Sequence, residues 1–343
     1  MSRRVPSGLT DVMHAVGFRE NLPVDDPSSL VDFTVPIPAP GPHDVLVRVR
    51  AASVNPVDTK IRRFSPAQDG APRILGFDAA GTVVAVGSDV SRFTAGDDVF
   101  YAGTTNRPGS NAELQVVDER IVGRKPATLD FAQAASLPLT TITAWESLFD
   151  HLELGPGSTG TILVVGAAGG AGSMATQLAC TRTRLEVIAT ASRPESSAFA
   201  VELGAHHVVD HTARLAEQVA AIAPCGVDYV FSAYSPHNVK TYAELMRPFG
   251  HVVAIDRAGE LDVLQQKSIT WHWELMFTRP LLLPEDDYQH RLLEQASELV
   301  DAGVLRPTAT VVLDGLRSST VREAHRLVES LAMIGKVVID YGS

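Results

Sequence analysis

The feature that most constrains the fold of this chain is an alternation of short apolar segments with helical patterns, which begins near residue 140. The apolar segments are TILVVG (161–166), EVIATAS (186–192), HHVVD (206–210), DYVFSA (228–233) and HVVAID (251–256). Strands that alternate with helices are joined by right-handed crossovers and form a parallel sheet covered by helices on both faces. The alternation therefore predicts a doubly wound α/β domain in this part of the chain.

Helical periodicity is legible between and after these strands. The run at 171–178 repeats apolar residues at the spacing of one helix face. The segment PESSAFAVEL (194–203) predicts another helix that ends at Gly204, because glycine suits a left-handed cap. A long amphipathic helix near 285–302 and a final strand, KVVIDY (336–341), are also predicted.

The first part of the chain has a different sequence pattern. VLVRVRAAS (45–53) and GTVVAVG (81–87) are typical of strands between turns, which indicates a β-rich domain. A length of 343 residues suits two domains, and we expect the C-terminal tail to return to the first of them. The predicted domains are a discontinuous β-rich one, 1–137 with 279–343, and an α/β one, 138–278.

Composition excludes several classes of partner. The chain has 40 acidic and 29 basic residues, and its formal net charge of −11 disfavours nucleic acid and anionic membrane surfaces. No apolar stretch reaches the roughly 20 residues that a membrane helix needs, and the N-terminus does not resemble a secretory signal. The two cysteines, Cys180 and Cys225, have no metal-ligand spacing. We expect two buried thiols in a cytoplasmic protein.

A glycine-rich turn follows the first strand of the α/β domain. In TILVVGAAGGAGSMATQLA, an apolar strand meets the turn GAAGGAG (166–172) and then a helix. Gly166 permits a tight turn, Gly169 and Gly170 allow a pyrophosphate to approach, and Gly172 allows the helix to pack on the strand. The helix then points unpaired N–H groups at the anion, Ala171 being in its first turn. A plain glycine-rich turn is the alternative, but the position between strand and helix favours dinucleotide binding.

The choice of nucleotide is expected after the second strand, roughly 20 to 25 residues beyond the first glycine, where an acid would bind a ribose hydroxyl. Ser192 and Arg193 stand there in the sequence ATASRPES. A hydroxyl and a guanidinium suit a 2′-phosphate, which predicts NADPH. Arg193 as a solvated surface residue is the alternative, and Glu195 nearby weakens the prediction.

Two segments of the β-rich part carry a family resemblance. ILGFDAAGTVVAVG (74–87) and AASVNPVDTKIR (51–62) resemble the medium-chain dehydrogenase/reductase family, and the resemblance spans nearly the whole chain. In zinc alcohol dehydrogenases of that family, the first segment carries a His-Glu pair and the second a metal-binding cysteine. Phe77, Asp78 and Asn55 stand at these positions here. Phenylalanine cannot bind zinc and asparagine is a poor ligand, so we expect no catalytic metal.

Further segments narrow the resemblance. VNPVDTKIR, the AAGGAG turn, PLTTITAW (138–145) and ITWHWELMFTRP (269–280) resemble the zinc-independent quinone oxidoreductase (zeta-crystallin-like) group, within its bacterial zinc-type alcohol-dehydrogenase-like subfamily. The resemblance implies a Rossmann domain with a GroES-like domain, and a homodimer. It also implies reduction of quinones or α,β-unsaturated carbonyls with NADPH.

The resemblance also assigns cofactor contacts by position. It implies that Asn55 and Thr143 approach the nicotinamide and that His211 lies by the adenine or ribose. The nicotinamide side would be lined by Ser232, Ala254, Ile255 and Asp256.

Hydride transfer to a quinone or enone without a metal leaves an oxyanion to be stabilised by hydrogen bonds. Asn55, Asp58 and Lys60 are the candidates for orienting the substrate carbonyl or supplying a proton. A structural ion pair between Asp58 and Lys60 is the alternative reading of two of them. Two other functions stay open: an NADPH-binding protein without turnover, and a zinc alcohol dehydrogenase, which would hold one metal per chain.

Two further signals have competing interpretations. His206, His207 and His211 resemble a metal cluster, but neighbours on a strand point to opposite faces. Trp271 and Trp273 lie in a strand-like run and either pack in the core or form a sheet edge at which two subunits join. Motifs of hydrolases, metalloproteases and P-loop proteins are lacking.

Overall fold

The computed structural model describes residues 11–67 and 72–342. The chain divides into two compact units. Unit 1 is Met1–Leu139 with Phe277–Ser343, and unit 2 is Thr140–Met276. The α/β domain predicted from the sequence, 138–278, differs from unit 2 by two residues at each end.

Unit 2 contains a six-stranded parallel sheet in the order β11-β10-β9-β12-β13-β14. Its strands are β9 (Thr161–Val165), β10 (Glu186–Thr190), β11 (His207–Val209), β12 (Val227–Ser232), β13 (Met246–Ala254) and β14 (Thr270–Trp273). The chain runs outward from β9 to β11 and then returns to β12, so the order reverses between β9 and β12. This reversal is the topological switch point at which open α/β sheets bind ligands. The predicted doubly wound fold is confirmed.

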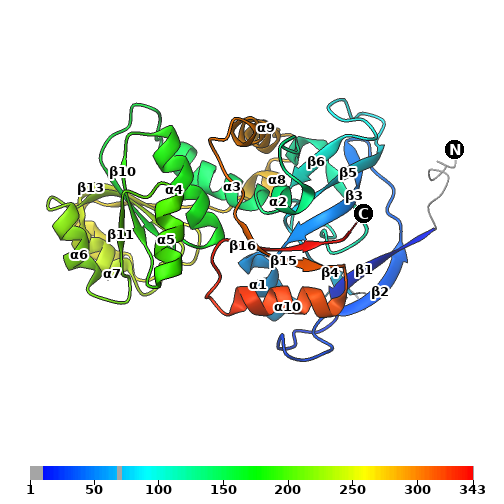
Figure 1. The fold of residues 1–343 in the computed structure, drawn as a ribbon, viewed down its shortest axis with the longest axis horizontal. Helices are drawn as coiled ribbons and strands as arrows, with labels where there is room; N and C mark the ends of the chain where they lie inside the picture. The colour runs from blue at the N-terminus through cyan, green and yellow to red at the C-terminus, as the bar shows by residue number, and fades with distance from the viewer. Residues whose placement is uncertain (1–10, 68–71, 343) are drawn as a thin grey trace. The chain divides into compact units, whose positions relative to one another are not determined.

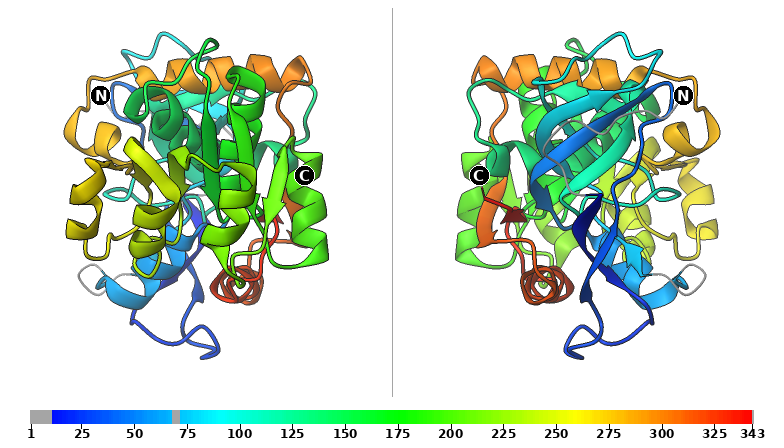
Figure 2. Two further views of the ribbon diagram at one scale, coloured as in Figure 1. Left: turned by 90° about the vertical axis from the view of Figure 1, so that its left-hand side faces the viewer. Right: turned by 90° about the vertical axis from the view of Figure 1, so that its right-hand side faces the viewer.

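Helices cover both faces of that sheet. They are α3 (Pro138–Trp145), which begins at the unit boundary, the π-helical turn η2 (Glu146–His151), α4 (Gly170–Arg182), α5 (Pro194–Glu202), α6 (Leu215–Ile222), α7 (Val239–Leu245) and the 3₁₀ turn η3 (Asp262–Lys267). Helices α4 and α5 lie on one face of the sheet, and α6 and α7 lie on the other (Figure 1; Figure 2, left). Helix α5 is followed by Gly204 at a φ of 104°, as the sequence predicts.

The core of unit 2 explains the two tryptophans of β14. Strand residues such as Leu163 and Val230 pack with Val219 of α6, and Trp271 packs partly buried against this cluster. Trp273 is 56 % exposed, and β14 is the edge strand of the sheet. Trp271 thus joins the core, whereas Trp273 lies at a free sheet edge.

Unit 1 is built from two β-sheets, which agrees with the β-rich domain predicted from the sequence. A three-stranded sheet has the order β2-β1-β4, and a seven-stranded sheet has the order β15-β16-β3-β5-β6-β8, with β7 paired to β3. The strands are β1 (Val12–Phe18), β2 (Val31–Pro36), β3 (Asp44–Ser53), β4 (Arg73–Ile74), β5 (Ala79–Val86), β6 (Asp98–Tyr101), β7 (Leu114–Asp118), β8 (Val122–Arg124), β15 (Ala309–Asp314) and β16 (Lys336–Asp340). Figure 2, right, shows the β1–β2 hairpin in dark blue.

The C-terminal tail completes unit 1. Strand β16 pairs antiparallel with β3, Val338 lying opposite Ser53, and β15 pairs parallel with β16. The helical elements are α1 (Pro56–Phe64), the 3₁₀ turn η1 (Glu119–Ile121), α2 (Phe131–Ala135), α8 (Thr278–Leu282), α9 (Tyr288–Asp301) and α10 (Ser318–Glu329). The predicted helix near 285–302 is therefore α9.

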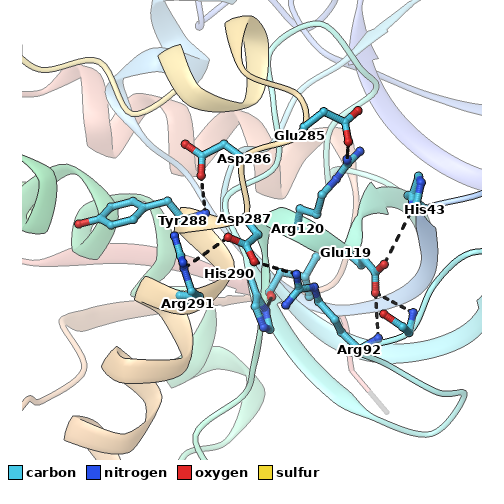
Figure 3. A network of polar contacts seen from close by, with 12 residues as sticks. His43, Arg92, Glu119, Arg120, Glu285, Asp286, Asp287, Tyr288, His290 and Arg291 are labelled. Carbon is cyan, nitrogen blue, oxygen red and sulfur yellow. Dashed lines mark hydrogen bonds and ion pairs between the residues drawn. The ribbon is translucent and has the colours of Figure 1, made fainter.

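Ion pairs attach the start of α9 to the N-terminal part of the unit (Figure 3). Asp287 accepts from Arg92 at 2.8 Å and lies 3.3 Å from Nε of Arg291, one turn into the helix. Arg120 of η1 pairs with Glu285 at 2.6 Å. The pairs of Asp287 with Arg92 and of Glu285 with Arg120 join segments far apart in the sequence within unit 1.

The cysteines differ from the expectation of two buried thiols, which is wrong for one of them. Cys225 is exposed, because it lies in the turn that follows α6. Cys180 is half-buried in α4, and burial raises the pKa of its thiol to about 12. Within the part of the chain that the structure describes, no helix is both long and apolar enough to span a membrane.

Candidate functional site

The glycine-rich turn of unit 2 joins β9 to α4 at the switch point of the sheet. Gly166 has a φ of 77°, and its N–H donates to Thr190 Oγ1 at 3.0 Å. A Cβ atom on Gly172 would lie 2.2 Å from the carbonyl oxygen of Gly166. Only glycine therefore allows this close packing of the helix on the turn. Gly169 is less constrained, because a Cβ there would meet the same oxygen at 3.4 Å.

The N-terminus of α4 offers unpaired backbone donors. Gly169 is the N-cap residue, it makes no side-chain cap, and the first turn contains no acidic residue. The amides of Gly170, Ala171 and Gly172 open the helix, and amides at these positions lack intrahelical acceptors. The first turn of this 13-residue helix therefore has neither a side-chain cap nor a negative charge. Such a helix end is suited to a diphosphate, because the backbone amides can donate to it and the helix dipole attracts its charge.

The expected 2′-phosphate residues lie beyond the carboxyl end of β10. Ser192 and Arg193 are exposed, and Arg193 is the N-cap residue of α5. Its backbone is fixed, because its carbonyl accepts from Ser197 N at 2.9 Å and its N–H donates to Ser196 Oγ at 3.2 Å. Glu195 is exposed in the same first turn.

His211 follows β11, the strand next to β10, and is exposed. The neighbouring histidines have other partners: His206 Nδ1 accepts from Val187 N at 2.9 Å, and His207 lies 2.8 Å from Glu186. Among residues 11–67 and 72–342, no three His, Cys, Asp or Glu side chains are grouped so as to bind one metal ion.

The expected nicotinamide-side residues meet at the ends of β12 and β13. Ser232 is buried, and its Oγ lies 2.9 Å from Ser235 Oγ and 2.7 Å from the Tyr242 hydroxyl. Asp256 accepts from Ser235 N at 2.8 Å, so it braces the loop after β12. Ala254 is the last residue of β13 and Ile255 follows it, its N–H donating to Ser232 O at 3.0 Å. Thr143 is buried in α3.

Sequence reasoning missed Tyr234 in this loop. Its ring lies against the glycine turn, because a Cβ on Gly166 would come within 2.9 Å of Tyr234 Cε2. The side chain is half exposed, and burial together with Asp256 raises the pKa of its hydroxyl. The available signal was an aromatic residue just beyond a strand that ends at the switch point.

Unit 1 contains a buried polar cluster around Asn55, the N-cap residue of α1. Asn55 Nδ2 donates to Asp78 Oδ2 at 2.9 Å. Lys336 Nζ donates to the same carboxylate oxygen at 2.9 Å and also to Asn55 Oδ1. Burial raises the pKa of Asp78, and the Lys336 ammonium acts against that shift. The second oxygen of Asp78 accepts from Leu139 N at 2.8 Å, so this carboxylate has no free oxygen.

Asp58 lies beside this cluster and supports it. It is fully buried, accepting from Asn55 N at 2.8 Å and from Gly76 N at 2.9 Å. Burial raises the pKa of Asp58 to about 7. Asp58 thereby holds the start of α1 to the turn before β5.

Lys60 does not join Asn55 and Asp58. It is exposed, and it forms no ion pair with any carboxylate of the described chain. The alternative of an ion pair between Asp58 and Lys60 is therefore wrong, because the cation that acts on Asp58 is Lys336. Sequence reasoning missed Lys336, although a lysine that opens an otherwise apolar strand was a signal that it needs a buried partner.

Two family models match the chain. The alcohol dehydrogenase GroES-like domain matches residues 41–127, and the zinc-binding dehydrogenase model matches residues 203–339. A zinc-type alcohol dehydrogenase-like protein of Staphylococcus epidermidis is 41% identical over 340 residues, covering 96% of this chain and 99% of the relative. The chain belongs to the medium-chain dehydrogenase/reductase family.

Solved structures of this oxidoreductase family have the same fold. A putative zinc-dependent alcohol dehydrogenase protein from Rhizobium etli CFN 42 is 49% identical, with a TM-score of 0.92 over 96% of this chain and 98% of that one. The quinone oxidoreductase from Coxiella burnetii is 27% identical, with a TM-score of 0.82 over 96% and 99% of the two chains. Unit 1 is thus the GroES-like part of a medium-chain dehydrogenase/reductase, and unit 2 is its Rossmann part.

Zinc is the metal that the family names imply, and the cluster of unit 1 allows a test of whether it fits. Phe77 stands next to Asp78 and is buried, its ring packed against Phe277 with centroids 5.6 Å apart. Zinc sites in proteins use thiolate, imidazole or carboxylate ligands. Of the three positions Asn55, Phe77 and Asp78, only Asp78 carries a carboxylate. That carboxylate is paired with Lys336 and accepts a hydrogen bond on each oxygen. These residues do not fit a zinc site.

Proposed function

We propose that this protein reduces quinones or α,β-unsaturated carbonyl compounds with NADPH, by direct hydride transfer and without a catalytic metal. The observation that carries the proposal is the pairing of Lys336 with Asp78 beside Asn55 and Phe77, because the residues at these three positions do not fit zinc. Without a Lewis acid, an unactivated carbonyl is a poor hydride acceptor. Conjugated acceptors need less activation, because the negative charge spreads onto an oxygen that hydrogen bonds can stabilise.

Unit 2 offers the groups that would hold NADPH, which supplies the hydride when it is bound. The diphosphate is assigned to the amides that open α4, at Gly170, Ala171 and Gly172. The 2′-phosphate is assigned to Ser192 and Arg193, which are both exposed. The backbone of Arg193 is held by the hydrogen bond from its N–H to Ser196 Oγ. The remaining assignments rest on the family resemblance: His211 by the adenine or ribose, and Thr143, Ser232, Ala254, Ile255 and Asp256 by the nicotinamide.

In unit 1, we assign the carbonyl oxygen of the acceptor to Asn55. Its Oδ1 accepts from Lys336 and its Nδ2 donates to Asp78, so the orientation of the amide is fixed. The amide nitrogen carries a second hydrogen, and because Asn55 is buried, the acceptor has to displace the atoms that cover it before this hydrogen can donate to the carbonyl oxygen. That hydrogen would stabilise the developing oxyanion, and solvent would complete the protonation. Asp58 acts through the backbone of Asn55 and is a positioning residue.

Initial rates with a panel of acceptors test this function. We expect NADPH oxidation with 1,2-naphthoquinone, 9,10-phenanthrenequinone or an alkyl vinyl ketone. We expect none with acetaldehyde, and no reduction of NADP⁺ by ethanol. Turnover of simple alcohols and aldehydes in preference to conjugated acceptors would overturn the proposal. A rise in melting temperature with NADPH and no turnover with any acceptor would favour the non-catalytic binding protein instead.

The homodimer is also proposed. Among the described residues, β14 pairs only with β13 and forms an edge of the six-stranded sheet; Trp273 at its end and Leu275 just after it are 56 % and 59 % exposed. An exposed apolar edge strand is suited to pairing with a second copy. Light scattering should give twice the mass of the chain. The variant Trp273→Glu should reduce it to one chain.

A further inference from the structure

We propose that unit 1 holds a second ligand site, which takes a small aromatic or alkyl carboxylate and is separate from the glycine turn of unit 2. The site is a cavity of about 360 Å³ beside β1, β2 and β7. Its walls are largely apolar and include Met13, Val35, Ile74, Leu114 and Val116. Most of these side chains belong to one hydrophobic cluster, so the cavity is an opening in the core of the unit.

Arg73 supplies the cavity with a positive charge that has no counter-ion among the residues the structure describes. Its Nη2 donates to Thr105 O at 3.1 Å and its Nη1 to Pro66 O at 3.5 Å, and both acceptors are neutral carbonyls. Among the described residues, no carboxylate pairs with it. The side chain is half-buried, and burial lowers the pKa of its guanidinium. A half-buried cation whose partners are neutral carbonyls is stabilised when an anion binds beside it.

Arg107 lines the same cavity, and unlike Arg73 it has a carboxylate counter-ion. It makes a bidentate pair with Asp44, at 2.8 and 3.0 Å, and so its charge is already neutralised. No aspartate or glutamate lines the described wall, in a chain whose net charge is −11. The cavity is therefore a local positive site on an acidic protein, and Arg73 is the group that an anion would bind.

The size and rigidity of the cavity indicate the class of ligand. A volume of about 360 Å³ lies within the range of small-molecule sites and exceeds that of a bicyclic aromatic acid. Four of the lining residues are prolines, Pro36, Pro38, Pro72 and Pro108, and their fixed φ angles limit the conformational freedom of the walls. One guanidinium without a described counter-ion, beside apolar walls, suits a monocarboxylate with an apolar body, because a phosphate would bring more charge than Arg73 neutralises.

Calorimetric titration of the full chain with 1-naphthoate, at saturating NADPH, tests the site. We expect one saturable site, and binding of the neutral analogue 1-naphthalenemethanol at least about tenfold weaker. Arg73→Met should weaken 1-naphthoate by about ten- to a hundredfold and leave the neutral analogue unchanged. Arg63→Met, which removes an exposed arginine of the same unit, is the matched control and should change neither.

Val35→Phe fills the cavity without touching the charge, and it should abolish binding of both probes while the melting temperature confirms folding. The proposal is overturned if 1-naphthoate shows no saturable binding in the millimolar range, or if Arg73→Met leaves its affinity unchanged. It is also overturned if a quinone substrate displaces the probe, because the probe would then occupy the acceptor site. All of these experiments measure binding or melting temperature and none measures turnover. A failure of the proposed reductase activity would therefore leave the test of this site unaffected.

Discussion

Lys336 Nζ lies 2.9 Å from Asp78 Oδ2 in the interior of unit 1, and the same ammonium group donates to Asn55. Both side chains of the ion pair are almost fully buried. Removing one partner of a buried pair leaves the other charge uncompensated, which is far more costly than losing a surface ion pair. This relationship links the C-terminal strand to the residue that is proposed to orient the acceptor.

Lys336→Met should therefore lower the free energy of unfolding by about 3–5 kcal/mol, measured by urea denaturation. Lys336→Met combined with Asp78→Asn should recover part of the loss, because both charges are then removed. Lys60→Met is the matched control: it removes an exposed lysine and should stay within about 0.5 kcal/mol of the natural chain. A Lys336→Met protein as stable as the natural one would contradict the role given to the pair.

Asp58 should make stability fall as the pH rises. Burial raises the pKa of Asp58 to about 7 in the folded chain, from 3.8 in the reference state. Above the unfolded pKa the folded state binds more protons than the unfolded state, so stability is lost between about pH 4 and pH 7. This residue contributes up to about 1.4 kcal/mol per pH unit in that window.

The measurement for Asp58 is urea denaturation of the natural chain and of Asp58→Asn at several pH values. The stability advantage of the natural chain over Asp58→Asn should shrink from about pH 4 to about pH 7 and then level off. Parallel pH profiles for the two proteins would mean that Asp58 is ionised throughout and that its two backbone hydrogen bonds outweigh its burial.

Two glycines of the same turn should respond differently to alanine. In Gly172→Ala the new Cβ would lie 2.2 Å from Gly166 O, so the turn or the helix must shift, at a cost of about 1–3 kcal/mol. In Gly169→Ala the contact is 3.4 Å at a φ of −80°, which alanine adopts without strain. NADPH titration by nicotinamide fluorescence and a thermal melt should show loss for Gly172→Ala and little change for Gly169→Ala. Equal behaviour of the two variants would argue against the close packing.

Arg193→Ala should discriminate between the two nucleotides. A charge-assisted hydrogen bond to a 2′-phosphate contributes about 1.5–3 kcal/mol, so NADPH affinity should fall about ten- to a hundredfold and NADH affinity should barely change. Arg214→Ala, which removes an exposed arginine paired with Glu217, is the control and should affect neither. Equal losses for NADPH and NADH after Arg193→Ala would show that Arg193 does not recognise the phosphate.

Most of the α/β unit could be predicted from the sequence, because the information there is local. Each apolar segment became a strand within a few residues, and the glycine turn lies between strand and helix as expected. The environment of the two tryptophans of β14 was harder to predict. In this edge strand one tryptophan packs against the core and the other is exposed, and the sequence does not show which is which.

The cluster around Asn55 could be predicted only in part, because its members are far apart in the sequence. Lys336 of β16 and Asp78, which directly precedes β5, are brought together because both β16 and β5 pair with β3, and no local pattern encodes this pairing. The same limit explains the error over Lys60, whose nearness to Asp58 in sequence indicated an ion pair. In α1 the two side chains point to different environments, one buried and one exposed.

Metal content measured together with quinone turnover tests the central claim most directly. Protein purified with and without added zinc, then dialysed against a chelator, would be assayed for bound metal by elemental analysis and for NADPH oxidation by 1,2-naphthoquinone. We predict equal turnover in all preparations and far less than one zinc per chain. Stoichiometric zinc whose removal abolishes turnover would contradict the account.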